Sequence, residues 1–439
     1  MLRRYMADSR EGNAAAYDVS RGIISARTGI VTSMNPFESK LLPRAMVARI
    51  ATCARVDGLG DIEYEPFELA GFGAGTSTLE AESAAIGEAV ERYGSVVGSG
   101  RVDVEWGTYR EFEDDAVHGD AFALPSSREI NDPLVPFDEN APRGWVRGHD
   151  LTVGVTTLVP AQLVLPSYRP RFDSERIASW TSNGLAAHRD ERAAVLAGLR
   201  EIEERDAFVI RYLNRWTPPE MPIRGISADV NFLLSTLPDE LPLKVRAWDI
   251  TLDLGQPVVL VGVFSSDDAL PPVCFGAACG GDYDYALRKG FFEAFYIMAS
   301  MSKRGFRRTV PEPLGTIASP RQQFQQSLRP GYRETLSWLL DEYVEWSPAV
   351  CQGGGALSEV LHSVAERGLR VITVDLTPPE LRDLDWHVCH VFVPGAQPLS
   401  FGQVRRATSR RLYELPIEFG LRDEVARELD LNPVPHPFA

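Results

Sequence analysis

ESAAIGEAVERYGS (residues 82–95) and DERAAVLAGLREIEERDA (residues 190–207) decide the fold, because each predicts a long helix that carries paired glutamates. A third stretch, ALRKGFFEA (residues 286–294), repeats their spacing: a small residue, another small residue four positions later, and a glutamate three after that. Residues at these spacings share one side of a helix. The carboxylates are therefore expected on the small-residue side, where helices pack closely.

Five glutamates occupy this packed side of the three helices. Burying carboxylates costs several kcal/mol each unless cations or hydrogen-bond donors compensate. Arg92, Arg205 and Lys289 offset part of the charge, and divalent cations are the simplest remainder; oxygen ligands without histidine or cysteine favour Mg²⁺. The alternative is a solvated ladder of ion pairs between residues three and four apart. The predicted metal ligands are Glu88, Glu91, Glu201, Glu204 and Glu293.

The rest of the chain predicts an α+β fold, because strands and helices do not alternate in a βαβ rhythm. Ser77 and Glu80 form a capping box at the start of the first long helix. A region of polar residues and prolines is expected to be irregular and peripheral. The expected elements are helices at 77–96, 190–213 and 284–302, paired strands within 243–266, strand–turn–strand at 154–167, helix then strand at 355–377, and the irregular region at 105–150.

Composition limits the function classes. Of 439 residues, 44% are hydrophobic and 24% charged, which is typical of a globular protein. The net charge of −16 argues against a nucleic-acid or anionic-membrane partner. No apolar run reaches the roughly 18 residues of a membrane span, and the first residues lack a signal-peptide pattern. Five scattered cysteines, with no CxxC pair, favour neither zinc nor disulfides, so a cytoplasmic location is expected.

Phosphate-binding signals are weak and the last residues are unusual. The chain has no GxxxxGK[ST] motif, and GFGAGTS (71–77) alone is more often a tight turn than an anion site. The final stretch, NPVPHPFA (432–439), alternates proline with other residues. Proline fixes the backbone and biases the preceding residue towards extended structure, so this tail is stiff and loses little entropy on docking.

In combination, these stretches resemble the signature regions of YcaO-domain proteins, which bind ATP and Mg²⁺ through ExxE pairs instead of a P-loop. VDLTPPE, VPGAQPLSFG and LNPVPHPFA resemble the family's C-terminal part, so the similarity runs from about Gly22 to the end. The PxPxP ending is similar to that of azoline-forming cyclodehydratases of the streptolysin-maturation type. This resemblance implies a single catalytic domain over 1–431, with a tail over 432–439 that packs towards the active site.

The resemblance also assigns roles to single residues. The paired glutamates would hold Mg²⁺ on the ATP phosphates, and Arg205 would contact phosphate or orient the second glutamate pair. The family's arginine in the third helix is replaced by Lys289, which keeps the charge but loses the bidentate fork. His436 or the terminal carboxylate of Ala439 would transfer protons if the tail reaches the site; the rival is a purely structural plug. The nucleotide-binding residues implied are Arg27, Glu88, Glu91, Asn183, Glu201, Glu204, Arg205, Lys289 and Glu293.

The implied activity is ATP-dependent conversion of Cys, Ser or Thr in a ribosomally made precursor peptide into thiazoline or oxazoline. The first signature begins only about seventy residues into the sequence, which leaves no room for a fused leader-binding domain, so a separate ThiF-like partner protein is expected. The resemblance also allows a flavin-dependent azoline dehydrogenase as a partner, and a homodimer. The alternatives are a thioamide- or amidine-forming enzyme, or a non-catalytic ATP-binding scaffold.

Overall fold

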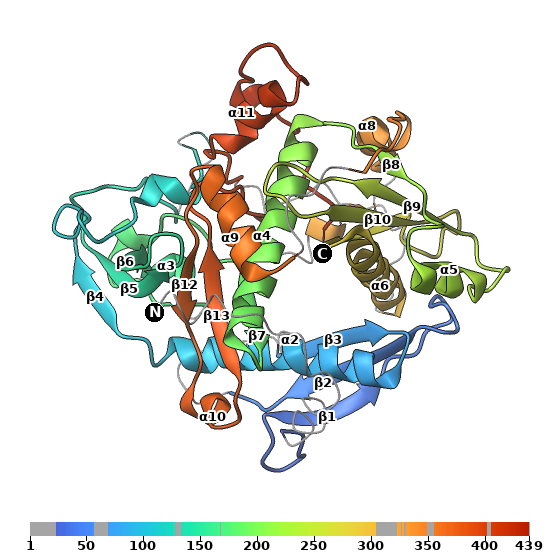
Figure 1. The fold of residues 1–439 in the computed structure, drawn as a ribbon, viewed down its shortest axis with the longest axis horizontal. Helices are drawn as coiled ribbons and strands as arrows, with labels where there is room; N and C mark the ends of the chain where they lie inside the picture. The colour runs from blue at the N-terminus through green and yellow to red at the C-terminus, as the bar shows by residue number, and fades with distance from the viewer. Residues whose placement is uncertain are drawn as a thin grey trace.

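The chain folds as three antiparallel sheets, each with a long helix packed against it (Figure 1). The computed structural model describes residues 23–56, 69–126, 128, 133–166, 168–303, 323–325, 327–328, 331–348, 355–401 and 405–438. The expected α+β class is confirmed.

The strands of this described part form sheets of three, four and six members. In spatial order they are β1 (Val31–Pro36), β2 (Val47–Cys53) and β3 (Ala70–Gly75); then β11 (Val273–Cys279), β10 (Val258–Ser265), β9 (Leu243–Asp249) and β8 (Glu220–Met221); then β4 (Val104–Gly107), β5 (Arg143–Asp150), β12 (Ile372–Asp375), β13 (His387–Phe392) and β7 (Leu185–His188), with β6 (Val155–Pro160) paired to β5.

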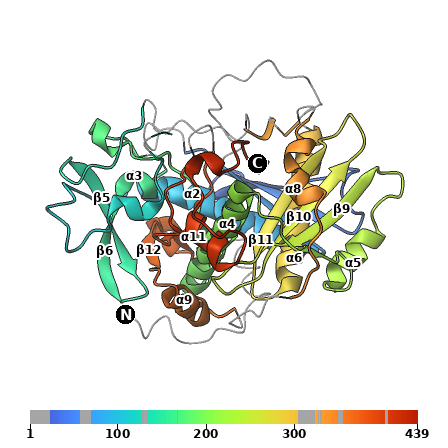
Figure 2. The same cartoon turned by 90° about the horizontal axis from the view of Figure 1, so that it is seen from above.

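Three long helices connect the sheets. α2 (Thr78–Ser99) packs on β3 and β2, α6 (Tyr283–Lys303) packs on β11 and β10, and α4 (Glu191–Asn214) packs on β13 and β7 while also touching β11. Figures 1 and 2 both place α4 at the centre of the molecule. The shorter helices are α3 (Ala161–Val164), α5 (Ala228–Ser235), α8 (Ser337–Leu340), α9 (Leu357–Glu366), α10 (Pro379–Arg382) and α11 (Arg411–Glu418), with 3-10 turns at Gly119–Phe122, Asp173–Glu175, Arg333–Leu336 and Glu428–Asp430.

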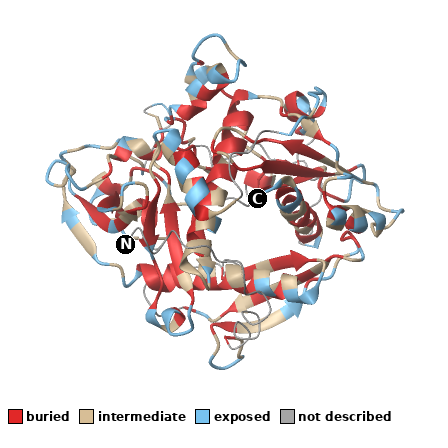
Figure 3. Cartoon of the chain, in the orientation of Figure 1, coloured by how far each residue is buried: buried red, intermediate tan, exposed pale blue. Residues whose placement is uncertain are grey.

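The small residues predicted to pack closely do so against strand backbones. A Cβ added at Gly73 would lie 1.9 Å from the Ala81 carbonyl oxygen, so β3 and α2 touch through their backbones. A Cβ at Gly276 of β11 would lie 2.4 Å from the carbonyl oxygen of Gly290 on α6. Figure 3 shows the buried residues gathered where these helices meet their sheets. The small-residue side of each helix therefore faces inward, as the sequence predicts.

Most expected elements are present, and two are wrong. The three helices, the β9–β10 pair and the helix–strand unit of α9 and β12 match the expectation, and the Ser77 side chain accepts a hydrogen bond from the Glu80 N–H. The second expected strand of 154–167 is instead the short helix α3, which begins directly after Pro160. The supposedly irregular region 105–150 contains β5, a largely buried strand whose alternation is hidden by Arg143 and two glycines.

Among the described helices, none has both the length and the apolar character needed to cross a lipid bilayer.

Candidate functional site

One glutamate from each long helix binds the backbone of the strand that the helix covers. Glu88 Oε2 accepts the Phe72 N–H at 2.8 Å, and Glu293 Oε2 accepts the Ala277 N–H at 2.8 Å. Glu201 Oε2 accepts the Gly184 N–H, just before β7, at 3.1 Å. Each bond spans 16 or 17 residues, because each joins equivalent positions of a strand–helix unit. Close packing of each helix on its strand therefore fixes the position of the three carboxylates along their helices.

The second glutamate of each pair lies beside an arginine of the same helix. Arg92 Nη1 is 3.7 Å from Glu91, and its other amino group is 3.7 Å from Glu88. Arg205 bonds Glu204 at 2.5 Å and reaches Glu201 at 3.4 Å. Each ExxE pair therefore has two carboxylates for one guanidinium.

The carboxylates of the different helices interact as one cluster. Burial raises the pKa of Glu91 to about 8; Arg92 opposes the rise, and the charges of Glu201 and Glu88 add to it. Burial likewise raises the pKa of Glu204 to about 8. The charge of Arg205 opposes this rise, and the charges of Glu293 and Glu201 add to it.

Burial also raises the pKa of Glu293. Burial by itself would lower the pKa of Arg205. The charges of Glu204, Glu201 and Glu293 outweigh this effect and raise the pKa above its usual value. Carboxylates from α2, α4 and α6 thus share one electrostatic site, and the two arginines do not neutralise it.

The donor set of this cluster fits ATP and Mg²⁺. Within the described residues, no three aspartate, glutamate, histidine or cysteine side chains are close enough to hold a metal ion by themselves. Mg²⁺ commonly takes one or two carboxylates and completes its shell with phosphate oxygens and water, so the carboxylate oxygens of an ExxE pair are suitable ligands for it. Arg205 Nε is buried and has no hydrogen-bond partner in the described structure, so it is a donor available to a phosphate oxygen. The predicted pairs would hold the ions.

The other nucleotide candidates lie outside the cluster. Asn183 Nδ2 donates to the Leu399 carbonyl at 2.7 Å and lines a cavity that also contacts Arg205. Lys289 Nζ lies 6.0 Å from the Tyr285 ring centre. Arg27 is exposed in a turn, where its backbone N–H lies 3.4 Å from Ser25 Oγ. Electrostatic interactions join the five glutamates and Arg205, whereas the contacts of the described residues include none between this group and Lys289 or Arg27.

The C-terminal tail lies against α4. Phe438 is 2% exposed, and its ring centre lies 4.2 Å from that of Phe208 and 5.6 Å from the Arg205 guanidinium carbon. The Pro435 carbonyl accepts hydrogen bonds from Tyr212 and Tyr332, both at 3.0 Å. The last described residues therefore cover the arginine of the second glutamate pair. Ala439 lies outside the described residues.

His436 is held by its surroundings. Its Nε2 lies 2.9 Å from the Ser400 carbonyl, and Gln323 Nε2 lies 3.0 Å from its Nδ1. Burial lowers the pKa of His436 to about 4, with the charge of Arg205 adding to the effect and the Ser400 bond opposing it. The imidazole is therefore neutral near pH 7, and both ring nitrogens have neighbours.

Sequence reasoning missed two further buried carboxylates on α4, those of Glu203 and Asp206. Glu203 is 2% exposed, accepts from Cys279 Sγ at 3.7 Å and lies 3.5 Å from Gln256. Burial raises the pKa of Glu203 to about 8, with Gln256 and Cys279 opposing. Apolar residues at 207–210 and 212–213, interrupted by Arg211, were the available signal that this part of α4 is buried on most sides.

Comparison with known proteins adds a family and a fold. A family model described as YcaO cyclodehydratase, ATP- and Mg²⁺-binding, matches residues 72–397. A solved heterocyclase in complex with substrate and cofactor has a TM-score of 0.76 and 21% identity, covering 99% of this chain and 60% of that one. The chain thus spans about three fifths of that heterocyclase.

Two other solved structures are similar over most of their length. YcaO from Methanopyrus kandleri, bound with AMPPCP and Mg²⁺, has a TM-score of 0.59 and 23% identity, covering 87% of this chain and 89% of that one. A chain of the E. coli microcin synthetase McbBCD complex with pro-MccB17 bound has a TM-score of 0.59 and 16% identity, covering 82% of this chain and 87% of that one. Both likenesses concern the fold.

Proposed function

The chain belongs to the YcaO family, whose binding of ATP and Mg²⁺ confirms these two expected cofactors, and we propose that it is an ATP-dependent peptide cyclodehydratase. Its substrate would be a ribosomally made precursor peptide, presented by a separate ThiF-like leader-binding protein. The observation that carries the proposal is the cluster of five glutamates from α2, α4 and α6, closed on one side by Arg205 and the tail.

The reaction needs an activated amide oxygen. The side-chain sulfur or oxygen of Cys, Ser or Thr bonds to the preceding carbonyl carbon, the carbonyl oxygen leaves as phosphate, and the nitrogen forms a C=N bond as the two protons depart. ATP supplies the phosphoryl group that turns this oxygen into a leaving group. The peptide loses one water for each ring. Phosphoryl transfer depends mostly on positioning and on neutralising charge.

The residues of this chain supply that environment. Glu88, Glu91, Glu201 and Glu204 would hold the ions, and Arg205 would donate to a phosphate oxygen. Phe438 lies over the Arg205 guanidinium, whose side chain is 16% exposed, and partial shielding from water would strengthen its interaction with an anion. His436 would orient the tail, because its ring nitrogens are already engaged by Ser400 and Gln323.

A reconstituted reaction tests this proposal. Candidate precursor peptide, partner protein, ATP and Mg²⁺ are incubated with the chain, and the peptide mass is measured. We expect the loss of one water mass per modified residue. Replacement of oxygen by sulfur would indicate a thioamide product, and an unchanged peptide mass with the complete mixture would contradict the proposal.

Two variants and one control link the activity to the site. Glu204→Gln and Phe438→Ala should each lower the rate of ring formation at least about 100-fold, the size of a lost charge or of a small misplacement at a reacting centre. Glu80→Gln removes a charge from α2 outside the cluster, where Glu80 binds the Thr76 N–H and Arg288, and should keep activity. Full activity of Glu204→Gln would refute the metal-site assignment.

A further inference from the structure

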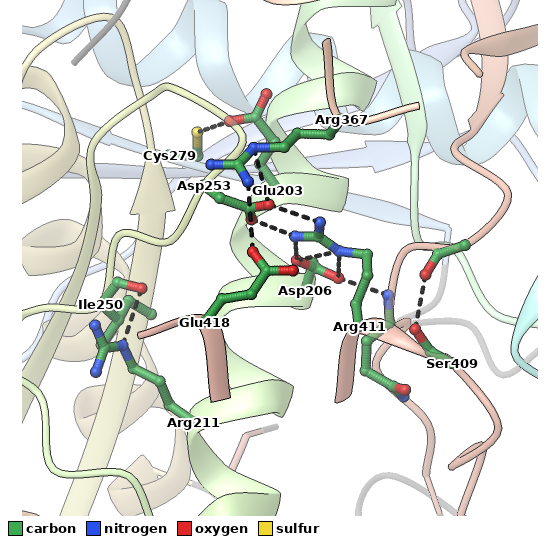
Figure 4. A network of polar contacts seen from close by, with 12 residues as sticks. Glu203, Asp206, Arg211, Ile250, Asp253, Cys279, Arg367, Ser409, Arg411 and Glu418 are labelled. Carbon is green, nitrogen blue, oxygen red and sulfur yellow. Dashed lines mark hydrogen bonds and ion pairs between the residues drawn. The ribbon is translucent and has the colours of Figure 1, made fainter. Parts of the chain in front are cut away.

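A buried ion-pair network lies on α4 beyond the glutamate cluster (Figure 4). Arg411 of α11 donates through Nε and Nη2 to Asp206 of α4, at 3.1 and 2.7 Å. The same guanidinium reaches Asp253 through Nη1 and Nη2, at 3.0 and 2.6 Å. One arginine thus joins two carboxylates by paired bonds, the geometry that an arginine fork favours.

The network is almost closed to solvent. The side chains of Asp206 and Asp253 are each 1% exposed and that of Arg411 is 10% exposed. At its outer end, Arg367 lies 3.3 Å from Asp253 and 3.5 Å from Glu418. Burial alone would lower the pKa of Arg411, but the charges and hydrogen bonds of Asp206 and Asp253 raise it. Buried ion pairs often add little stability over apolar residues, and in some proteins they specify one arrangement of the chain.

Asp206 also holds a loop that reaches the active site. Its Oδ1 accepts the Gln397 backbone N–H at 2.7 Å. The Gln397 side chain donates to the Arg406 carbonyl at 2.6 Å, so the loop is tied on both sides. Gln397 is only 1% exposed. The fork between Asp206 and Arg411 therefore anchors the segment that follows Ala396.

The next residues of this loop bind Asn183 and the C-terminal tail, two parts of the site that lie far away in the sequence. The Leu399 carbonyl accepts from Asn183 Nδ2 at 2.7 Å, and the Ser400 carbonyl lies 2.9 Å from His436 Nε2 in the tail. Ala396 and Pro398 line the same small cavity as Arg205. A shift of this loop would move Asn183 and the tail together relative to Arg205.

We propose that Asp206 and Arg411 are positioning residues for the site: they fix the loop 396–400, and through it Asn183 and the tail, against Arg205. This inference rests on the proposed cyclodehydratase function. Asp206 directly follows Arg205 on the same rigid helix, so the anchor and the arginine that it serves move as one body. Neither Asp206 nor Arg411 touches the glutamate cluster in the described contacts.

Arg411→Lys tests the inference, because lysine keeps the charge and loses the fork. Arg246→Lys is the control: Arg246 makes a two-bond fork with Glu220, at 2.9 and 2.6 Å, between β9 and β8. This fork is more exposed than that of Arg411 and lies at the edge of the four-stranded sheet opposite β11. We expect the kcat of ring formation to fall about 10- to 100-fold in Arg411→Lys, as for a small misplacement at a reacting centre. The Kd of ATP should change less than about threefold, since the metal-binding pairs stay intact. In Arg246→Lys, kcat should stay within about twofold.

Hydrogen exchange supplies a readout independent of turnover. Backbone amides of 399–400 and of 434, 436 and 438 should exchange at least tenfold faster in Arg411→Lys than in the wild type, while those of α2 and α6 stay unchanged. If Arg411→Lys does not fold, Asp253→Asn provides the same comparison with the shape of the network kept. Double-mutant analysis of Asp206→Asn with Arg411→Lys should give strongly non-additive effects on kcat.

The outcomes separate this inference from the proposed function. If the wild type forms no rings, the proposed reaction is wrong. If the tail amides nevertheless exchange faster only in Arg411→Lys, the positioning role still holds. Equal kcat in Arg411→Lys and Arg246→Lys, or exchange that speeds up uniformly over the whole chain, overturns the positioning role.

Discussion

The carboxylate cluster costs stability, and removing one charge should therefore stabilise the metal-free protein. Glu91 is the suitable position, because burial raises its pKa from 4.5 to about 8. Its side chain is 19% exposed. Near pH 7 it is mostly protonated in the folded chain and ionised in the unfolded chain. The unfolded state then binds fewer protons, so the contribution of Glu91 to stability falls as pH rises from about 4.5 to about 8.

The size of the effect follows from the two pKa values. At pH 7 the gap between pH and the unfolded pKa corresponds to about 3 kcal/mol at 1.36 kcal/mol per unit. Glu91→Gln keeps the shape and removes this penalty. For a chain of 439 residues, with an unfolding entropy of about 2.1 cal/mol/K per residue, that gain raises Tm by about 3 °C. At pH 5 the gain should shrink to less than about 1 kcal/mol.

Thermal unfolding in EDTA at pH 5, 7 and 8 measures this gain. The control is Glu80→Gln on the same helix, which loses favourable bonds to Thr76 and Arg288 and should not be stabilised. Addition of Mg²⁺ and ATP should stabilise the wild type more than Glu91→Gln. A Glu91→Gln protein that is less stable than the wild type at pH 7, or equally stabilised at pH 5, would refute the reasoning.

Two further predictions concern stability. Burial lowers the pKa of His390 to about 4, so stability falls as pH drops from about 6.5 towards 4, and His390→Gln should remove about 2 kcal/mol of the difference in urea unfolding between pH 7 and pH 5. Gly276→Ala, whose Cβ would lie 2.4 Å from the Gly290 carbonyl, should lose about 1–3 kcal/mol, whereas Gly87→Ala meets no described atom within 4 Å and should gain about 0.5–1 kcal/mol in thermal melts. A destabilised Gly87→Ala or a neutral Gly276→Ala would contradict this packing.

The helices and their carboxylates were predictable because both follow from local spacing. Glycine and alanine at four-residue intervals mark the close contact, and a glutamate on that side has to lie at the strand backbone. Glu88 and Glu293 do so, at the same 2.8 Å from an amide nitrogen. Spacing along one helix needs no knowledge of the other elements.

The remaining features depend on residues far apart in the chain. β5 is a largely buried strand that pairs with β12, β4 and β6, although its own sequence is half polar. The bond from Asp206 to Gln397 spans 191 residues, and no spacing rule predicts it. Lys289 was assigned to the nucleotide from its place in a motif, yet its side chain lies towards Tyr285. Local patterns predict which face of an element is buried but not which distant segment covers it.

The three strand–helix units also explain why the site has two glutamate pairs and one single glutamate. Three residues after the strand-binding glutamate, the first two units carry Glu91 and Glu204, whereas the third carries Tyr296. Tyr296 stacks on Phe72, the residue whose N–H binds Glu88, with the rings 18° from parallel. The third unit therefore uses this position to pack against the first and contributes only Glu293 to the cluster. Each complete pair has two carboxylates for one arginine, and a bound cation would favour the ionised form of both.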